Sequence, residues 1–272
     1  MAWQVTKSSV QVMGILNVTP DSFSDGGRFH SCDRALQHVE QMLSEGVDII
    51  DVGGESTRPG AAAVPVQEEL DRVIPVLAAI RERFDVALSV DTSKPEVMVA
   101  AVSEGADLIN DVCALQQPGA LAACAPLLVP VCLMHMQGQP RTMQQAPNYD
   151  DVAQDISQFF RERIAACEMA GVARERLILD PGFGFGKTLS HNVDLLRRLA
   201  AFSDLGLPIL VGLSRKSMIG ALLDNRPVAG RLHGSVAGAV IAAMQGVNIV
   251  RVHDVGATVD ALKIVNAVMN RQ

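Results

Sequence analysis

Short apolar segments alternate with longer segments of helical periodicity along the whole chain. Eight of the short segments are rich in β-branched and other apolar residues, and each is followed by a stretch long enough for a helix. The predicted strands are residues 10–17, 47–53, 86–91, 107–111, 129–135, 177–181, 208–214 and 248–253. The chain is therefore expected to repeat a strand–helix unit eight times.

The segments between the strands carry apolar stripes at the spacing of one helix face. One stripe contains Ala35, Val39, Met42 and Leu43, and the next contains Leu70, Val73, Ile74, Leu77 and Ala78. Four of the predicted helices end at a glycine that precedes the next strand, as expected for a left-handed helix-ending residue. These glycines are Gly46, Gly105, Gly171 and Gly246.

Eight such units in 272 residues match the size of a (β/α)₈ TIM barrel. An open, doubly wound sheet is the alternative fold, but no GxGxxG follows the first strand. No change in composition and no proline-rich linker divides the chain. We therefore predict one barrel domain over residues 1–272.

Composition narrows the classes of partner. The formal net charge of −7 argues against a nucleic-acid or anionic membrane surface, and no segment reaches 18 uninterrupted apolar residues. The five cysteines include no CxxC pair and no short Cys/His cluster, so they are expected to be reduced. These features favour a cytoplasmic protein with small-molecule ligands.

Polar residues stand at the end of nearly every predicted strand. In a TIM barrel these ends converge on the face that carries the chemistry. The residues are Asn17, Glu55, Ser56, Thr57, Arg58, Asp91, Asn110, His135, Asp180, Ser214, Arg215, Lys216, Arg251 and His253. Individual alternatives remain open: Asp91 and Asn110 could cap the following helix, and His135 could serve packing.

Two further patterns indicate a ligand site. The run from Pro181 to Lys187 (PGFGFGK) could cradle phosphate, although its spacing is not that of a P-loop. Its glycines could instead let backbone approach a flat ligand beside Phe183 and Phe185, which suggest a stacking surface unless one of them packs in the core. Arg251 and His253 share one face of the last strand and suggest an anion site, unless Arg251 pairs with an acid such as Asp254.

Read in order, these motifs resemble the dihydropteroate synthase family, the pterin-binding TIM barrels. The matching segments are MGILNVTPDSFSDGG (13–27), DVGGESTRPG (51–60), SVDTSKPEV (89–97), INDV (109–112), LMHMQGQP (133–140), LDPGFGFGKTLSHN (179–192), VGLSRKSMIG (211–220) and IVRVHDV (249–255). The resemblance implies an enzyme that condenses 6-hydroxymethyl-7,8-dihydropterin diphosphate with p-aminobenzoate in folate biosynthesis. It also implies a homodimer, Mg²⁺ as cofactor and sensitivity to sulfonamides.

The same resemblance assigns roles to residues of this chain. Lys216, Asp180, Arg251 and His253 are the expected catalytic residues. The pterin site would use Asp91, Asn110, Asp180, Lys216 and Phe185, and the diphosphate site Asn17, Thr57, Arg251 and His253, with Asn17 also at the metal. The p-aminobenzoate site would use Arg58, Pro59, Phe185, Ser214 and Lys216, and the loops after the first two strands would cover the site.

The chemistry of the ligand agrees with these residue types. A pterin edge presents an N–H beside an amino group, and the two oxygens of an ionised carboxylate such as Asp180 match that pair of donors. Two other functions remain possible: a pterin-binding methyltransferase, which would not need the STRPG, SRKS or RVH segments, and a catalytically silent pterin-binding paralogue.

Overall fold

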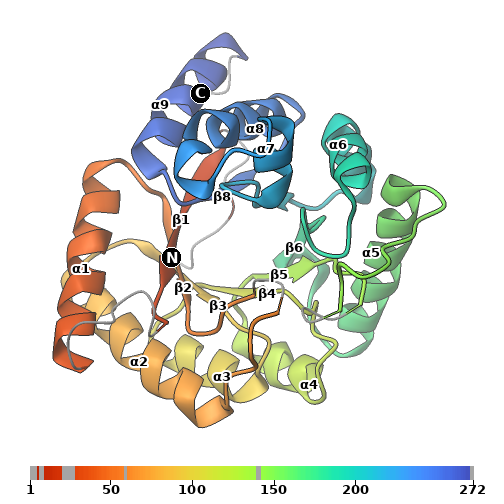
Figure 1. The fold of residues 1–272 in the computed structure, drawn as a ribbon. Helices are drawn as coiled ribbons and strands as arrows, with labels where there is room; N and C mark the ends of the chain where they lie inside the picture. The colour runs from red at the N-terminus through yellow and green to blue at the C-terminus, as the bar shows by residue number, and fades with distance from the viewer. Residues whose placement is uncertain (1–4, 6–8, 20–27, 58–59, 139–141, 270–272) are drawn as a thin grey trace.

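A closed ring of parallel strands forms the centre of the protein, with helices around it (Figure 1). The computed structural model describes residues 5, 9–19, 28–57, 60–138 and 142–269. The eight strands are hydrogen-bonded in the order β6-β5-β4-β3-β2-β1-β8-β7. A parallel bridge between Leu179 and Ile209 joins β6 to the segment before β7 and closes the ring. The TIM barrel is therefore confirmed, and the alternative of an open sheet is wrong.

All eight strands lie where the sequence predicts them, and each is shorter than predicted. They are β1 (Gln11–Asn17), β2 (Ile49–Gly53), β3 (Ala87–Asp91), β4 (Leu108–Asp111), β5 (Val131–Met134), β6 (Leu177–Asp180), β7 (Leu210–Val211) and β8 (Ile249–Val252). The α-helices are α1 (Arg28–Ser44), α2 (Val66–Arg83), α3 (Pro95–Ser103), α4 (Ala120–Cys124), α5 (Val152–Met169), α6 (Leu189–Arg197), α7 (Ser217–Leu222), α8 (Leu232–Met244) and α9 (Val255–Val268).

The period of two along each strand divides the apolar residues into two clusters. Residues that point outward, such as Ile50, Val90 and Val250, join the large core between strands and helices. A smaller cluster of inward side chains fills the barrel near the starts of the strands. Its members are Met13, Ile49, Leu108, Cys132, Ile178, Leu210 and Ile249. The inward position two residues after a member of this cluster is polar in several strands, so the alternation itself places polar groups at the barrel mouth.

The helix ends follow the local sequence. Gly46, Gly105, Gly171 and Gly246 all have positive φ, between 88° and 97°, as the helix-ending interpretation requires. At the start of α5, the Asp151 carboxylate accepts hydrogen bonds from the backbone of Ala153 and Gln154, both at 3.0 Å.

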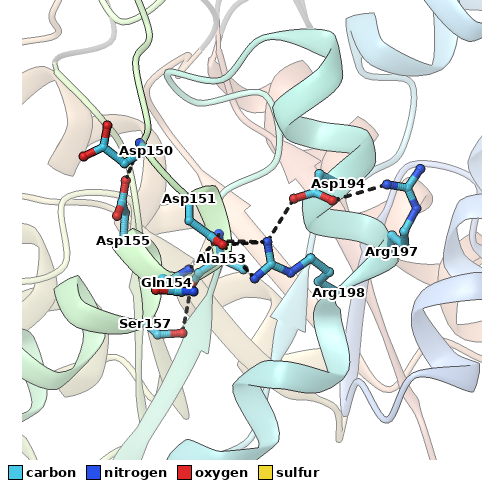
Figure 2. A network of polar contacts seen from close by, with 9 residues as sticks. All are labelled: Asp150, Asp151, Ala153, Gln154, Asp155, Ser157, Asp194, Arg197 and Arg198. Carbon is cyan, nitrogen blue, oxygen red and sulfur yellow. Dashed lines mark hydrogen bonds and ion pairs between the residues drawn. The ribbon is translucent and has the colours of Figure 1, made fainter.

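A small ion-pair network ties α5 to α6. Arg198, which follows α6, donates to both Asp151 and Asp194 (Figure 2). The N-cap of one helix is thereby linked to the end of the next. This network lies in the outer layer of helices and involves no residue at the end of a strand.

Candidate active site

A buried charge cluster occupies the barrel mouth. The guanidinium of Arg251 on β8 donates from Nε to Asp51 Oδ2 at 2.6 Å and from Nη2 to Asp91 Oδ2 at 2.7 Å. Asn110 on β4 also donates to Asp51 Oδ2, at 3.2 Å. One arginine therefore joins inward residues of strands β2, β3 and β8, with β4 connected through the shared aspartate.

The cluster is held by tertiary contacts rather than by helix caps. Asp91 and Asn110 do not cap a helix, because α3 begins after Lys94 and α4 begins after Gly119. The capping alternative for these two residues is therefore wrong. Burial raises the pKa of Asp91 to about 7; the charge of Arg251 opposes this rise and that of Asp51 adds to it.

Asp180 and Lys216 form the other side of the mouth. The Asp180 carboxylate, at the end of β6, accepts a hydrogen bond from the backbone of Gly182 at 2.8 Å. Burial raises its pKa, and the ammonium of Lys216 opposes that shift. Burial likewise lowers the pKa of Lys216 to about 8, while the charge of Asp180 raises it. The two groups therefore stabilise each other's charged forms inside the barrel.

The glycine-rich run shapes this side of the site. Lys216 donates to the carbonyl of Phe183 and lies over the Phe185 ring, with Nζ 4.4 Å from the ring centroid. Phe183 is fully buried in the core, whereas Phe185 packs at the edge of the mouth. Of the two phenylalanines, Phe185 is the one available as a surface for a flat ligand.

His135 takes part in packing behind the run. Its ring is buried, stands edge-on to Phe159 at 4.8 Å between centroids, and has Nδ1 3.0 Å from Nζ of Lys187. Burial, followed by the charge of Lys187, lowers the pKa of His135 to about 2. The packing alternative is therefore the one that fits His135.

Ser214 and His253 lie together between β7 and β8. Ser214 Oγ accepts from the backbone N of His253 at 3.1 Å and lies 3.1 Å from its ring Nδ1. Asp254 pairs with Arg215, whose Nε donates to Oδ2 at 2.9 Å. Arg251 thus has carboxylate partners, as the alternative interpretation expected, but Asp254 is not among them.

The remaining predicted residues lie at the ends of β1 and β2. Asn17 is the partly exposed last residue of β1. Thr57 and Asp91 line a cavity of about 750 Å³, a volume in the range of small-molecule sites. Arg58, Pro59 and residues 20–27 of the first predicted cover loop lie outside the described residues.

Sequence reasoning missed Asp51, which is fully buried at the centre of the charge cluster. It occupies the inward position two residues after Ile49, so the alternation that singled out Arg251 and His253 could also have identified it. It missed Lys94 too, whose ammonium pairs with Glu55 and with the buried Glu69 beside the cavity. No local motif predicts this contact, because it joins the N-cap of α3 to helix α2 and to the loop after β2.

The turn after β6 leads to a stability prediction. Gly182 has φ +70°, and a Cβ on it would lie 1.9 Å from the carbonyl oxygen of His135. Gly171 has φ +88°, but no atom lies within 4 Å of its Cβ position. Gly171→Ala should cost only the conformational term of about 1–2 kcal/mol, whereas Gly182→Ala should cost more because backbone must also move. Urea unfolding of both variants checks this, and equal losses would contradict it.

Two further observations concern membrane-spanning helices and the state of the cysteines. Within the part of the chain that the structure describes, no helix is long and apolar enough to span a membrane. All five cysteines are free thiols, as the sequence predicted.

Comparison with known proteins identifies the family to which the chain belongs. Residues 13–253 match the family described as pterin binding enzyme, and the chain belongs to this family. Its relatives include the Escherichia coli K12 dihydropteroate synthase, which is 61% identical over 263 residues, covering 97% of this chain and 93% of the relative.

Solved structures narrow the likeness to the same enzyme. Dihydropteroate synthase from Yersinia pestis in a sulfonamide drug complex has a TM-score of 0.93 and 60% identity, with 97% of this chain and 96% of that chain covered. The enzyme from Xanthomonas albilineans in complex with 7,8-dihydropteroate has a TM-score of 0.86 and 48% identity, with coverage of 97% and 94%.

Proposed function

We propose that the protein is a dihydropteroate synthase, a transferase that condenses 6-hydroxymethyl-7,8-dihydropterin diphosphate with p-aminobenzoate to give 7,8-dihydropteroate and diphosphate in folate biosynthesis. The observation that carries the proposal is the gathering of Asp91, Asn110, Asp180 and Lys216 at one end of the barrel. Full-length similarity to dihydropteroate synthases supports the same activity.

The pterin would lie against the β6 side of the mouth. The Asp180 carboxylate would accept from the ring N–H and the amino group, and the Phe185 ring would stack on the flat heterocycle. Lys216, placed over Phe185, would donate to a ring acceptor. Asp91 and Asn110 would take the remaining polar positions of the pterin.

Catalysis would consist of orientation and charge stabilisation, without a side-chain nucleophile. The amine nitrogen of p-aminobenzoate bonds to the pterin methylene carbon as the bond from that carbon to the diphosphate oxygen breaks. The amine then loses a proton and diphosphate leaves. Lys216, Asp180, Arg251 and His253 are the residues proposed to hold the reacting groups and balance the developing charge.

Diphosphate would bind at the ends of β1, β2 and β8, through Asn17, Thr57, Arg251 and His253. The two carboxylate contacts of Arg251 use two of its five N–H groups. Among the described residues, no three His, Cys, Asp or Glu side chains form a metal cluster. Mg²⁺ held by Asn17 would therefore take further oxygen ligands from diphosphate and water, which suits an ion usually bound by few protein groups. Bound there, the ion would offset charge on the leaving group.

The p-aminobenzoate site is proposed to lie beside Phe185, Ser214 and Lys216, with Arg58 and Pro59 from the loop after β2. Ser214 lies next to His253 and so adjoins the proposed diphosphate site. Sulfonamides resemble p-aminobenzoate in having an aniline ring with a polar group opposite the amine. They are therefore expected to compete for the same position.

Purified protein supplied with both substrates and Mg²⁺ should form dihydropteroate and release diphosphate in equal amounts, measured by chromatography and a coupled diphosphate assay. Diphosphate should not accumulate when p-aminobenzoate is omitted. Pterin binding without product would identify a silent paralogue. Methyl transfer to or from a reduced pterin, without condensation, would identify the methyltransferase alternative.

A homodimer is proposed to form through the C-terminal helices. α8 and α9 lie side by side (Figure 1) and carry the exposed apolar residues Ile241, Met244, Ile264 and Val268. Such exposure on neighbouring helices is typical of a protein interface. We also propose that the dimer is cytoplasmic, because free cysteines are typical of a reducing compartment.

Introducing charge at that surface should separate the subunits. The test variant is Val268→Glu, at a residue that is 74% exposed. The control is Leu128→Glu, at a residue before β5 that is 78% exposed. Light scattering after gel filtration should show a dimer for wild type and control, and a monomer for Val268→Glu. A monomeric wild type, or a dimer that survives in Val268→Glu, would contradict this interface.

A further inference from the structure

Lys187 is a buried lysine whose side chain folds back onto the loop that precedes it. It is only 3% exposed. Its ammonium lies 2.9 Å from the Gly182 carbonyl, 3.0 Å from the Phe185 carbonyl, and 3.0 Å and 3.4 Å from Nδ1 and the carbonyl of His135. The cation is thus surrounded by groups of the protein itself, which disfavours a role for Lys187 in cradling phosphate.

The surroundings of this ammonium suit a cation, and three of the four neighbouring polar atoms lie within 3.0 Å. A lysine ammonium has three N–H donors and no acceptor, and each neighbouring atom can act as an acceptor. Nδ1 of His135 fills this role when the ring proton is on Nε2 of the neutral imidazole. Burial lowers the pKa of Lys187 to about 7, while the nearby charge of Asp180 raises it. The acceptor-only surroundings favour the charged form.

The backbone conformation of the loop directs two carbonyls at the Lys187 ammonium. Gly182, Gly184 and Gly186 have φ values of +70°, +79° and +61°, and this alternation turns the carbonyls of residues 182 and 185 toward the interior. Buried carbonyls without donors are unfavourable. The Lys187 ammonium donates to both carbonyls and also joins the loop to His135 after β5. The Gly182 carbonyl accepts in addition from the backbone N of Phe185 at 3.1 Å, so the ammonium matters most for the Phe185 carbonyl.

The opposite side of the same loop carries the proposed pterin contacts. The backbone N of Gly182 donates to Asp180, the Phe183 carbonyl accepts from Lys216, and the Phe185 ring lies beneath the Lys216 ammonium. Displacement of the loop would therefore disturb Asp180, Phe185 and Lys216 together.

We infer that Lys187 is a positioning residue for pterin recognition: its buried ammonium fixes the 182–187 loop from behind, so that Asp180, Phe185 and Lys216 are held in the geometry that binds the heterocycle. This inference rests on the proposed function. The role is indirect, because the carbonyls of Gly182 and Phe185 and the His135 ring already occupy the ammonium.

The test compares two buried cations at opposite ends of β6. Arg176, just before β6, donates to the carbonyls of Val129, Ala125 and Cys124. Lys187→Met and Arg176→Met each remove a buried cation that donates to backbone carbonyls, so both should lower thermal stability. Only Lys187→Met should weaken binding of 6-hydroxymethylpterin, by about tenfold to hundredfold, in calorimetric titrations at a temperature where circular dichroism shows both variants folded.

A third variant separates hydrogen bonding from volume. Lys187→Gln retains N–H donors on a side chain one bond shorter than lysine and should recover part of the pterin affinity lost in Lys187→Met. It is also the variant to titrate if Lys187→Met does not fold. Pterin affinity within about twofold of wild type in Lys187→Met, or equal losses in Lys187→Met and Arg176→Met, would overturn the inference, as would failure of both Lys187 variants to fold while Arg176→Met folds.

Wild-type condensation activity is measured in the same series. Without wild-type pterin binding or product, the proposed function fails. With wild-type activity and an unaffected Lys187→Met, only the positioning role fails.

Discussion

Asp180→Asn is expected to weaken binding of 6-hydroxymethylpterin by about 100-fold or more. The carboxylate would otherwise accept two hydrogen bonds from the pterin edge, and bonds to a charged group contribute about 1.5–3 kcal/mol each. Asparagine presents an N–H₂ donor in place of one acceptor oxygen, so a donor would face a donor. The variant should still fold, because Gly182 can donate to the remaining amide oxygen.

Isothermal titration calorimetry checks this result against a buried control. Asp111 is also a fully buried strand-end aspartate that accepts backbone hydrogen bonds, from Cys113 and Leu115. Asp111→Asn should affect stability while leaving pterin affinity close to that of wild type. Lys216→Ala should reduce affinity, as Asp180→Asn does. Unchanged affinity in both Asp180→Asn and Lys216→Ala would show that this pocket is not the pterin site.

Arg251→Met is expected to lower the free energy of unfolding by about 3–5 kcal/mol at neutral pH, because it leaves buried charge without its partner. Asp51 is fully buried and Asp91 nearly so, and both are paired with Arg251. The pKa of Asp91 is already raised to about 7, and loss of the cation should raise it further. Since a carboxyl group with a raised folded-state pKa loses stability as pH rises through that pKa, the deficit should be greater at pH 8 than at pH 5.

Guanidinium unfolding at the two pH values measures this effect. The control is Lys263→Met, which removes an exposed pair with Asp260 and should change stability by less than about 1 kcal/mol. An Arg251→Met deficit no larger than that of the control, or one that shrinks as pH rises, would contradict the buried cluster. The same variant should bind the diphosphate-bearing substrate more weakly than wild type if Arg251 contacts the leaving group.

The strand and helix order could be predicted from sequence because it depends on local periodicity. β7 shows the limit: the apolar run 208–214 suggests seven residues, but only Leu210 and Val211 form the strand. Pairing with β8 and the bridge at Ile209 fixes that length, and neither is visible in the run itself. Closure of the ring likewise depends on register between strands far apart in the chain.

The positions of the candidate site residues could be predicted because they stand at strand ends. The contacts between these residues could not be predicted. Asp91, Asn110, Asp180, Lys216 and Arg251 could be named from position and resemblance. Which of them touch could not, because the contact from Asp51 to Arg251 joins residues 200 positions apart. The same limitation concealed the internal role of Lys187, whose place at the end of a glycine run suggests phosphate instead.

A crystal structure with 6-hydroxymethylpterin would show where the pterin binds, which we propose to be the barrel mouth between β6 and β3. We expect the pterin edge within hydrogen-bond distance of the Asp180 carboxylate, the ring on Phe185, and Lys216 at a ring acceptor. Pterin density elsewhere on the protein, or a pterin at the mouth without contact to Asp180, would contradict this proposal.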